Sequence, residues 1–380
     1  MTSVRSGELA NFAGPGPGMC SDERRGPAKT CLARFCRAAM RCACGRRTAA
    51  SQLPLSSIIK PVARHANLRG GAGGGFPNPN KMELPVPSFE RPVERALVHR
   101  QSTSEVWPTD FEALGQGRYQ VSLQWPRSHA FYTTTPPDSA VLAETIRQVT
   151  ILTCHLGHSV PLDSRFLMTG LGFELRSDEG CRGEWNALEV TALVEASDIR
   201  RTARGELRSA RMNIEISGPD GRVIAVGHGD ALLAGSVAYR RMRGPNANAT
   251  PPRRTAEPVE PERVGRSRAS DVTVVETIAG LEIQIDHSHP VFFEHSLDHV
   301  PGVALIEACK QVACLFLGNP SADLQRFEAR FHRVIEFNTP ATITVASDAV
   351  GVRFAVLQGG TVAMDASAGV SVSGEVAVLP

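Results

Sequence analysis

The stretch HVPGVALIEACKQ, residues 299–311, reads as a loop, a Pro-Gly turn and an apolar helix that contains one acid, Glu307. A second stretch, DSAVLAETIRQ at residues 138–148, repeats the order of an acid (Glu144), a cation three residues later and then a glutamine. An acid and a cation three residues apart share one face of a helix. The two stretches therefore predict two equivalent helices, each with a carboxylate inside an apolar surface.

The sequence around these helices repeats as well. SHAFY at 128–132 and SHPVFF at 288–293 precede predicted helices at 139–157 and 300–318, and long apolar-alternating segments follow each helix. This order predicts an α+β fold in which a long antiparallel sheet wraps around a central helix, made twice in tandem. Two such units can pair as a pseudo-dimer, like a homodimer fused into one chain. The predicted strands lie at 118–125, 164–176, 184–198, 206–218, 223–235, 271–285, 326–337, 342–348, 352–358 and 361–376.

Charge and composition divide the chain. The first 81 residues hold 13 Lys/Arg and 3 Asp/Glu, a net charge of +10, whereas the rest has a net charge of −8. We expect residues 1–84 to be a disordered basic leader, with a true translation start at Met82 as the alternative. Residues 85–243 and 271–380 are expected to be the two folded domains. The Pro- and Arg-rich segment 244–270, which has no core pattern, is expected to link them.

Several classes of function are disfavoured. A mildly acidic folded part is not typical of a nucleic-acid-binding protein, and no run of 18 apolar residues predicts a membrane span. The nine cysteines are scattered and lack paired spacing, which indicates a reducing, cytoplasmic location and no metal site. The nucleotide motifs GxGxxG and GxxxxGK do not occur, so we expect no cofactor.

Five stretches resemble one family. LVHRQSTSEVWPTDF (97–111), QWPRSHAFY (124–132), LAETIRQ (142–148), DHSHPVFFEHSLDHVPGVALIEA (286–308) and FNTPATI (337–343) are similar to signatures of the A-factor biosynthesis family, the gamma-butyrolactone autoregulator synthases of antibiotic-producing bacteria. This resemblance implies two hot-dog domains. It also implies transfer of a beta-ketoacyl group from acyl-carrier protein to the hydroxyl of dihydroxyacetone phosphate, followed by ring closure to a butenolide phosphate.

Two other functions stay open. One is an acyl-carrier-protein dehydratase or thioesterase of the hot-dog type, since FFEHSLDHVPGVALIEACKQ is also similar to hot-dog dehydratases. In that comparison His295 is the match to the catalytic histidine. The other is a non-catalytic acyl-binding regulatory protein, because a fold alone does not decide function.

The predicted site contains Glu144, Glu307 and His295 as catalytic residues. Burial among apolar neighbours is expected to raise the pKa of the Glu307 carboxyl group, which suits a general base, and both acids are expected to face one shared crevice. Alternatively, each acid forms only a salt bridge within its helix. The predicted substrate-binding residues are Arg147, Lys310, Gly302 and His299, where Lys310 replaces the arginine of the family pattern.

Their expected tasks differ. Arg147 and Lys310 would hold a carboxylate ionised or bind the substrate phosphate. Gly302 opens the helix N-terminus to a substrate carbonyl oxygen, an oxyanion-hole arrangement. His299 is expected to cap the helix or line the site, and His129 and His289 to occupy equivalent, structural positions.

Overall fold

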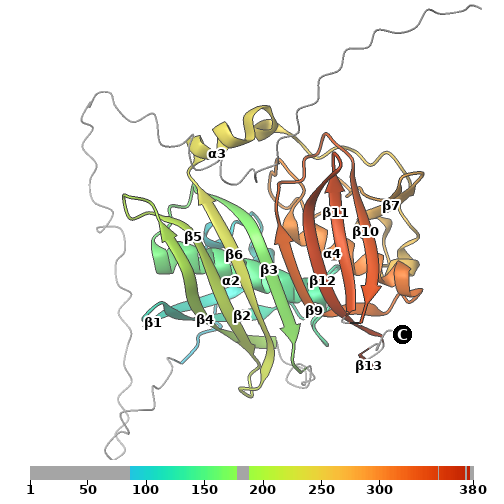
Figure 1. The fold of residues 1–380 in the computed structure, drawn as a ribbon. Helices are drawn as coiled ribbons and strands as arrows, with labels where there is room; N and C mark the ends of the chain where they lie inside the picture. Colours follow the sequence, from blue (N-terminus) through green and yellow to red (C-terminus); the bar gives the residue numbers. More distant parts are fainter. Residues whose placement is uncertain (1–85, 178–187, 350, 373–374, 377–380) are drawn as a thin grey trace, which may run out of the picture. The chain divides into compact units, whose positions relative to one another are not determined.

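The computed structural model describes residues 86–177, 188–349, 351–372 and 375–376, all within one compact unit, Pro77–Pro380 (Figure 1). The predicted leader and the first residues of the predicted strand 184–198 lie outside the described residues. The division into two domains and a linker stays a prediction.

The described strands form one antiparallel sheet in the order β1-β2-β4-β5-β6-β3-β9-β12-β11-β10-β8-β7, with β13 paired to β12. Pairing of β3 with β9 joins the two halves, with Gly172 opposite Glu328. The predicted α+β pseudo-dimer is therefore confirmed. The strands are β1 (Pro108–Gly115), β2 (Arg118–Trp125), β3 (Arg165–Leu175), β4 (Leu188–Arg201), β5 (Leu207–Ser217), β6 (Val223–Ala234), β7 (Val274–Thr277), β8 (Gly280–Ile283), β9 (Ala322–Phe331), β10 (Ala341–Asp348), β11 (Gly351–Gln358), β12 (Thr361–Val372) and β13 (Glu375–Val376).

Two long helices lie against this sheet, one in each half: α2 (Ser139–His158) and α4 (Gly302–Leu317), which also contact each other (Figure 1). A short helix, α3 (Ser236–Arg243), follows β6 at the end of the first half. The described 3-10 helices are η2 (Arg95–Val98), η3 (Thr103–Glu105), η5 (Gly244–Asn248), η6 (Pro261–Val264) and η7 (Ala269–Asp271).

Local sequence explains where the long helices begin and end. Asp138 caps α2, because its Oδ1 accepts a hydrogen bond from the Val141 amide at 2.9 Å. Helix α4 begins after Pro301 and ends at Gly318, whose left-handed φ of 62° favours glycine. Helix α2 packs closely on the sheet at Ile146. A Cβ on Gly227 of β6 would lie 2.6 Å from this side chain, so glycine at this position permits the close packing.

Some predicted elements were wrong in detail. The single strand predicted at 271–285 is a short hairpin, β7 and β8, because Gly280 makes a turn with φ of 109°. The segment Ser236–Arg243, for which no element was predicted, is helical, and Tyr239 and Arg243 within it are buried. The segment 244–270 also contributes buried side chains to the core, Val259 and Val264.

Among the described residues, no helix combines the length and the apolar character that crossing a membrane requires.

Candidate functional site

Glu144 lies at the centre of a buried polar network in the first half. Its Oε1 lies 2.6 Å from Arg100 Nη2, and Arg147 donates to both carboxylate oxygens, each at 2.9 Å. Gln148 also donates to Glu144 at 2.6 Å, while its own carbonyl oxygen accepts from the Trp107 amide at 3.1 Å. The carboxylate is therefore fully satisfied by two arginines and a glutamine.

Glu307 has an equivalent network in the second half. Arg266 donates to its two oxygens at 2.8 and 2.6 Å, and Gln311 donates at 2.7 Å. The carbonyl oxygen of Gln311 accepts from the Thr273 amide at 2.8 Å, as Gln148 does from Trp107. Arg266 thus takes the place of Arg100, and it comes from the segment predicted to be only a linker.

The same two arginines tie the halves together. Arg100 Nη1 donates to the Val291 carbonyl oxygen of the second half at 3.3 Å, and Arg266 Nη1 donates to the Phe131 carbonyl oxygen of the first half at 2.8 Å. Both carbonyls belong to the repeated SHAFY and SHPVFF segments. In each segment the histidine has a structural role, as expected: Nδ1 of His129 and of His289 accepts hydrogen bonds from two following backbone amides.

The expected rise in carboxyl pKa was wrong for Glu307, and the pKa of Glu144 is lowered as well. Burial alone would raise the pKa of Glu144, but Arg100 and Arg147 outweigh it and lower the pKa to about 2. At Glu307, burial also raises the pKa of the carboxyl group, but the positive charges of Arg266 and Lys310 outweigh this effect and lower the pKa below its ordinary value. Both carboxylates are therefore ionised at neutral pH and are weak bases.

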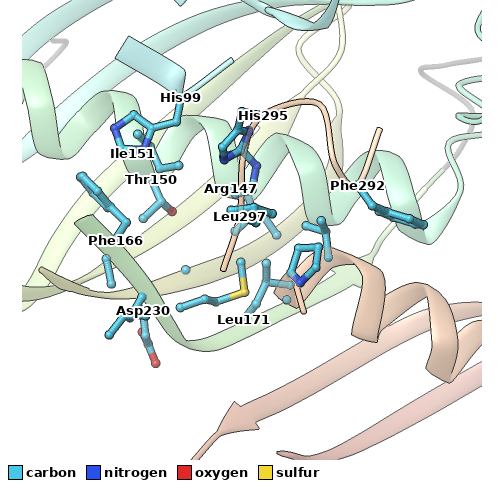
Figure 2. Close-up of a pocket in the computed structure, with 18 of the residues that line it drawn as sticks. His99, Arg147, Thr150, Ile151, Phe166, Leu171, Asp230, Phe292, His295 and Leu297 are labelled. Carbon is cyan, nitrogen blue, oxygen red and sulfur yellow. The ribbon is translucent and has the colours of Figure 1, made fainter. Parts of the chain in front are cut away.

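A cavity of about 140 Å³ lies between the two halves, beside Arg147 (Figure 2). Its walls come from α2, β3, β6, the segment 291–301 and the start of α4. Most of the lining is apolar, and its polar members are Arg100, Arg147, Thr150, Asp230 and three histidines. The lining residues include Arg100, Arg147, Met168, His295, His299 and Gly302.

The structure brings together some of the predicted site residues but not all. Arg147, His295, His299 and Gly302 line the cavity. Glu144 lies directly behind it, bound to the two arginines that do line it.

The other two predicted residues are elsewhere. Glu307 and Lys310 are buried and are not part of the cavity wall. The prediction that both acids face one shared crevice was therefore wrong, since Glu144 is one contact removed from the cavity and Glu307 does not approach it.

Lys310 contacts two carboxylates at the start of α2 rather than the cavity. Its Nζ lies 3.9 Å from Asp138 Oδ2 and 3.9 Å from Asp323 Oδ1. Asp323 in turn accepts hydrogen bonds from the backbone amide and the hydroxyl of Ser139, at 3.1 and 2.6 Å. The N-terminus of α2 is thus already occupied by the chain's own carboxylates.

The N-terminus of α4 is different. The Ala304 and Leu305 amides donate to the Pro301 carbonyl oxygen, and among the described residues we find no acceptor for the amides of Gly302 and Val303. The side chain beside Gly302 is the thioether of Met168, not a carboxylate. This helix end therefore presents free amides and the positive end of its dipole to the cavity.

Two imidazoles in the cavity are held neutral. Burial, together with Arg147 and Arg100, lowers the pKa of His295 to about 4. Burial and the neighbouring His155 lower the pKa of His99 to about 3, and the Nε2 atoms of these two rings lie 3.0 Å apart. Figure 2 shows His99 and His295 among the side chains that line the cavity.

Sequence reasoning missed Arg100 and Arg266. HRQSTSEVW at 99–107 and GRSRASDVT at 265–273 share an arginine, an acid five residues later and a following strand. This weak repeat was hidden because the second copy lies in a Pro- and Arg-rich segment. Asp298, which binds His299, was also missed, because adjacent Asp and His residues give no periodic signal.

The comparisons with known proteins identify a family for this chain. A family model described as the A-factor biosynthesis hotdog domain matches residues 84–233 and 247–377. A Streptomyces virginiae protein named 2-oxo-3-(phosphooxy)propyl 3-oxoalkanoate synthase is 34% identical over 259 residues, which are 66% of this chain and 86% of that protein. A protein of the same name from Streptomyces griseus subsp. griseus is 32% identical over 273 residues, 68% of this chain and 85% of that protein.

Solved structures are more remote. An acyl-ACP thioesterase from Bacteroides thetaiotaomicron matches with a TM-score of 0.39 and 13% identity, over 66% of this chain and 98% of that one. A 12:0-ACP thioesterase from Umbellularia californica matches with a TM-score of 0.37 and 10% identity, over 69% of this chain and 100% of that one. At these scores the likeness carries no argument about the site.

Proposed function

Because this chain belongs to the A-factor biosynthesis hotdog family, we propose that it is a 2-oxo-3-(phosphooxy)propyl 3-oxoalkanoate synthase, the name that its relatives carry. That name describes an ester between a 3-oxo fatty acid and the hydroxyl group of dihydroxyacetone phosphate. The chain is then an acyltransferase that uses a 3-oxoacyl thioester and dihydroxyacetone phosphate.

The observation that carries the proposal is the composition of one cavity. Its apolar walls suit an acyl chain, and the guanidinium groups of Arg100 and Arg147 suit a phosphate. The free amides at the start of α4 suit the carbonyl oxygen of a thioester. These are the three groups that the two substrates must bring together.

The acyl-transfer step follows from this placement. The hydroxyl oxygen of dihydroxyacetone phosphate attacks the thioester carbon while its proton goes to a base in the cavity. The carbonyl oxygen becomes an oxyanion, which the amides of Gly302 and Val303 stabilise. Collapse of this intermediate breaks the C–S bond, and the departing thiolate takes up the proton, so that an ester and a free thiol result.

Ring closure then needs only the chemistry of the ester. The carbon between its two carbonyl groups is acidic, and it can add to the ketone of the triose part of the same molecule. Loss of one water gives a five-membered unsaturated lactone that keeps the phosphate. This is the butenolide phosphate that precedes gamma-butyrolactone autoregulators.

We propose that Glu144 positions Arg147 and Arg100 rather than acting as the base. An ionised carboxylate held by two guanidinium groups is a poor proton acceptor, but it fixes both cations at the cavity wall. In the other half, Glu307 is proposed to fix Arg266 in the interior, without a role at the cavity. Lys310, which contacts Asp138 and Asp323, is not proposed as a substrate ligand.

The acyl donor is proposed to be acyl-carrier protein, and the location cytoplasmic. Helix α3 buries Tyr239 and Arg243 on one side and exposes Arg240 and Arg241 on the other. The two exposed arginines give a basic surface that suits an acidic carrier protein. The described cysteines, Cys154, Cys309 and Cys314, are buried free thiols, which supports a reducing compartment.

The test is to incubate the purified full-length chain with a 3-oxoacyl thioester and dihydroxyacetone phosphate and to identify products by mass spectrometry. The proposal predicts the phosphorylated ester or its butenolide, and free thiol in equal amount. Release of the free 3-oxo acid would instead indicate a thioesterase. Dehydration of a 3-hydroxyacyl thioester would indicate a dehydratase, and binding without turnover a regulatory module.

Two matched variants sharpen this test. Arg147→Met removes a cation from the cavity wall, and we expect kcat/KM for dihydroxyacetone phosphate to fall about 30-fold. This factor corresponds to the loss of about 2 kcal/mol, the contribution of a hydrogen bond to a charged group. Lys310→Met changes the equivalent position of α4, which lies outside the cavity. In folded protein this variant should have the same kcat/KM for dihydroxyacetone phosphate as wild type. Equal effects of the two changes would contradict a phosphate site at Arg147.

A further inference from the structure

A second polar cluster borders the cavity at His299. Nδ1 of His299 lies 2.6 Å from Asp298 Oδ1, and the same oxygen accepts a hydrogen bond from the Tyr239 hydroxyl at 2.8 Å. The other oxygen of Asp298 accepts from Arg243 Nε at 3.2 Å. A carboxylate thus binds one nitrogen of an imidazole whose residue lines the cavity.

This carboxylate is firmly held by helix α3. Arg243, whose side chain is only 4% exposed, also donates from Nη2 to the Asp298 carbonyl oxygen at 2.9 Å and binds Glu336 at 2.5 and 2.7 Å. Burial would raise the pKa of Asp298, but the contacts to His299 and Tyr239 lower it to about 2. Asp298 is therefore an ionised, fixed acceptor.

We propose that His299 is the general base of the acyl-transfer step and that Asp298 is its positioning residue, held in place by Tyr239 and Arg243 of α3. A carboxylate at Nδ1 keeps the imidazole proton there and leaves the lone pair of Nε2 for the cavity. His299 lies three residues before Gly302, so this base is near the amides that receive the oxyanion. The inference rests on the proposed function.

The proton balance is simple. Nε2 of His299 takes the proton of the attacking hydroxyl as the new C–O bond forms, and the resulting imidazolium is stabilised by Asp298. When the C–S bond breaks, the imidazolium returns the same proton to the carrier thiolate. The imidazole ends the cycle neutral, and no other reactant is needed.

The other candidates in the cavity are less suited. The Nδ1 of His295 is buried, lies 3.4 Å from Glu294 Oε2 and makes no hydrogen bond among the described residues. Arg147 and Arg100 beside it disfavour a positive imidazolium. Glu144 is already bound to both arginines.

Steady-state kinetics test the assignment. We expect His299→Gln to lower kcat about 100-fold or more, the usual size of general-base catalysis, with little change in KM for dihydroxyacetone phosphate. Asp298→Asn should lower kcat by about tenfold with the same KM, since a positioning residue acts through the imidazole. Glu336→Gln is the matched control, because it removes a carboxylate from Arg243 without touching His299, and it should keep kcat close to wild type.

Nitrogen-15 NMR of the imidazoles provides a readout that does not need activity. Wild-type His299 should carry its proton on Nδ1, and Asp298→Asn should shift the tautomer populations. A proton on Nε2 in wild type, or His299→Gln with wild-type kcat in folded protein, would overturn the inference. If wild type forms no ester at all, the proposed function fails instead, and the NMR result still decides whether Asp298 positions the ring.

Discussion

Glu144 and Glu307 bind the same types of residue: an arginine from a preceding segment and a glutamine one turn further along the helix. Their surroundings differ. Glu144 supports two cations at the cavity, whereas Glu307 supports Arg266 in the interior. Both carboxylates are almost fully buried. Removing either one takes away the main counter-charge of a buried arginine, which costs more than the pair contributes.

We therefore expect Glu307→Gln and Glu144→Gln to destabilise the fold by similar amounts, about 3 kcal/mol each. Only Glu144→Gln should also weaken turnover beyond the loss of folded protein, because Arg147 loses its orientation. Urea denaturation gives the first quantity, and kinetics on the folded fraction give the second. A Glu307→Gln variant as inactive as Glu144→Gln would show that the second acid has a catalytic role after all.

The depressed pKa of Glu144 predicts a loss of stability in acid. With an ordinary value of 4.5 and a folded value of about 2, the ionised carboxylate contributes roughly 3 kcal/mol above pH 4.5. This contribution is lost as the pH falls from about 4.5 towards 2, since protonation then favours the unfolded chain. Urea midpoints from pH 7 to pH 3 should fall more steeply for wild type than for Glu144→Gln, and equal slopes would refute the assignment.

At the scale of elements, the two long helices differ in what meets their N-termini. Ser139 at the start of α2 binds the carboxylate of Asp323 from β9, whereas Gly302 at the start of α4 meets Met168 from β3. The dipole and the free amides of a helix start attract an anion in either case. The chain supplies that anion in one half and leaves the place open in the other.

Met168→Asp should therefore convert the open helix start into an occupied one. The new carboxylate would accept hydrogen bonds from the amides of Gly302 and Val303 and compete with the substrate carbonyl. We expect kcat/KM to fall about 100-fold, the size expected when an oxyanion site is lost, without loss of folded protein in circular dichroism. Met168→Leu keeps the apolar contact and is the control. If the aspartate variant keeps wild-type activity, the oxyanion does not bind at α4.

How much of these elements was predictable depends on how local their signals are. Helix 139–157 was predicted within one residue of its observed end, because Asp138 caps it and the apolar period is long. Helix α3 was missed, since eight residues with three arginines are too short and too polar to give a clear periodic signal. Contacts of Tyr239 and Arg243 with Asp298 stabilise this helix. Arg266 was missed for a similar reason, because its partner lies 41 residues away in sequence.

At the scale of the whole described unit, the pseudo-symmetry of the fold does not extend to the two helix starts. The exchange of Arg100 and Arg266 between halves makes each half complete the other, which holds the repeated loops at 131 and 291 in place. The repeat in the sequence predicted that the two halves pair, but not the two arginines that join them. It could not predict that only one of the two equivalent places would be open, because that depends on Asp323 and Met168, which lie on strands with no shared motif.

This asymmetry predicts a single substrate site per chain. Calorimetric titration with dihydroxyacetone phosphate should show one binding event per chain, and Arg147→Met should weaken it. Asp323→Ala frees the Ser139 amide and hydroxyl beside Lys310, so that variant should gain a second, weaker phosphate-binding event that Arg147→Met does not affect. Two equivalent binding events in wild type would contradict this prediction. They would mean that Lys310 separates from Asp138 and Asp323 in solution and that both halves bind substrate.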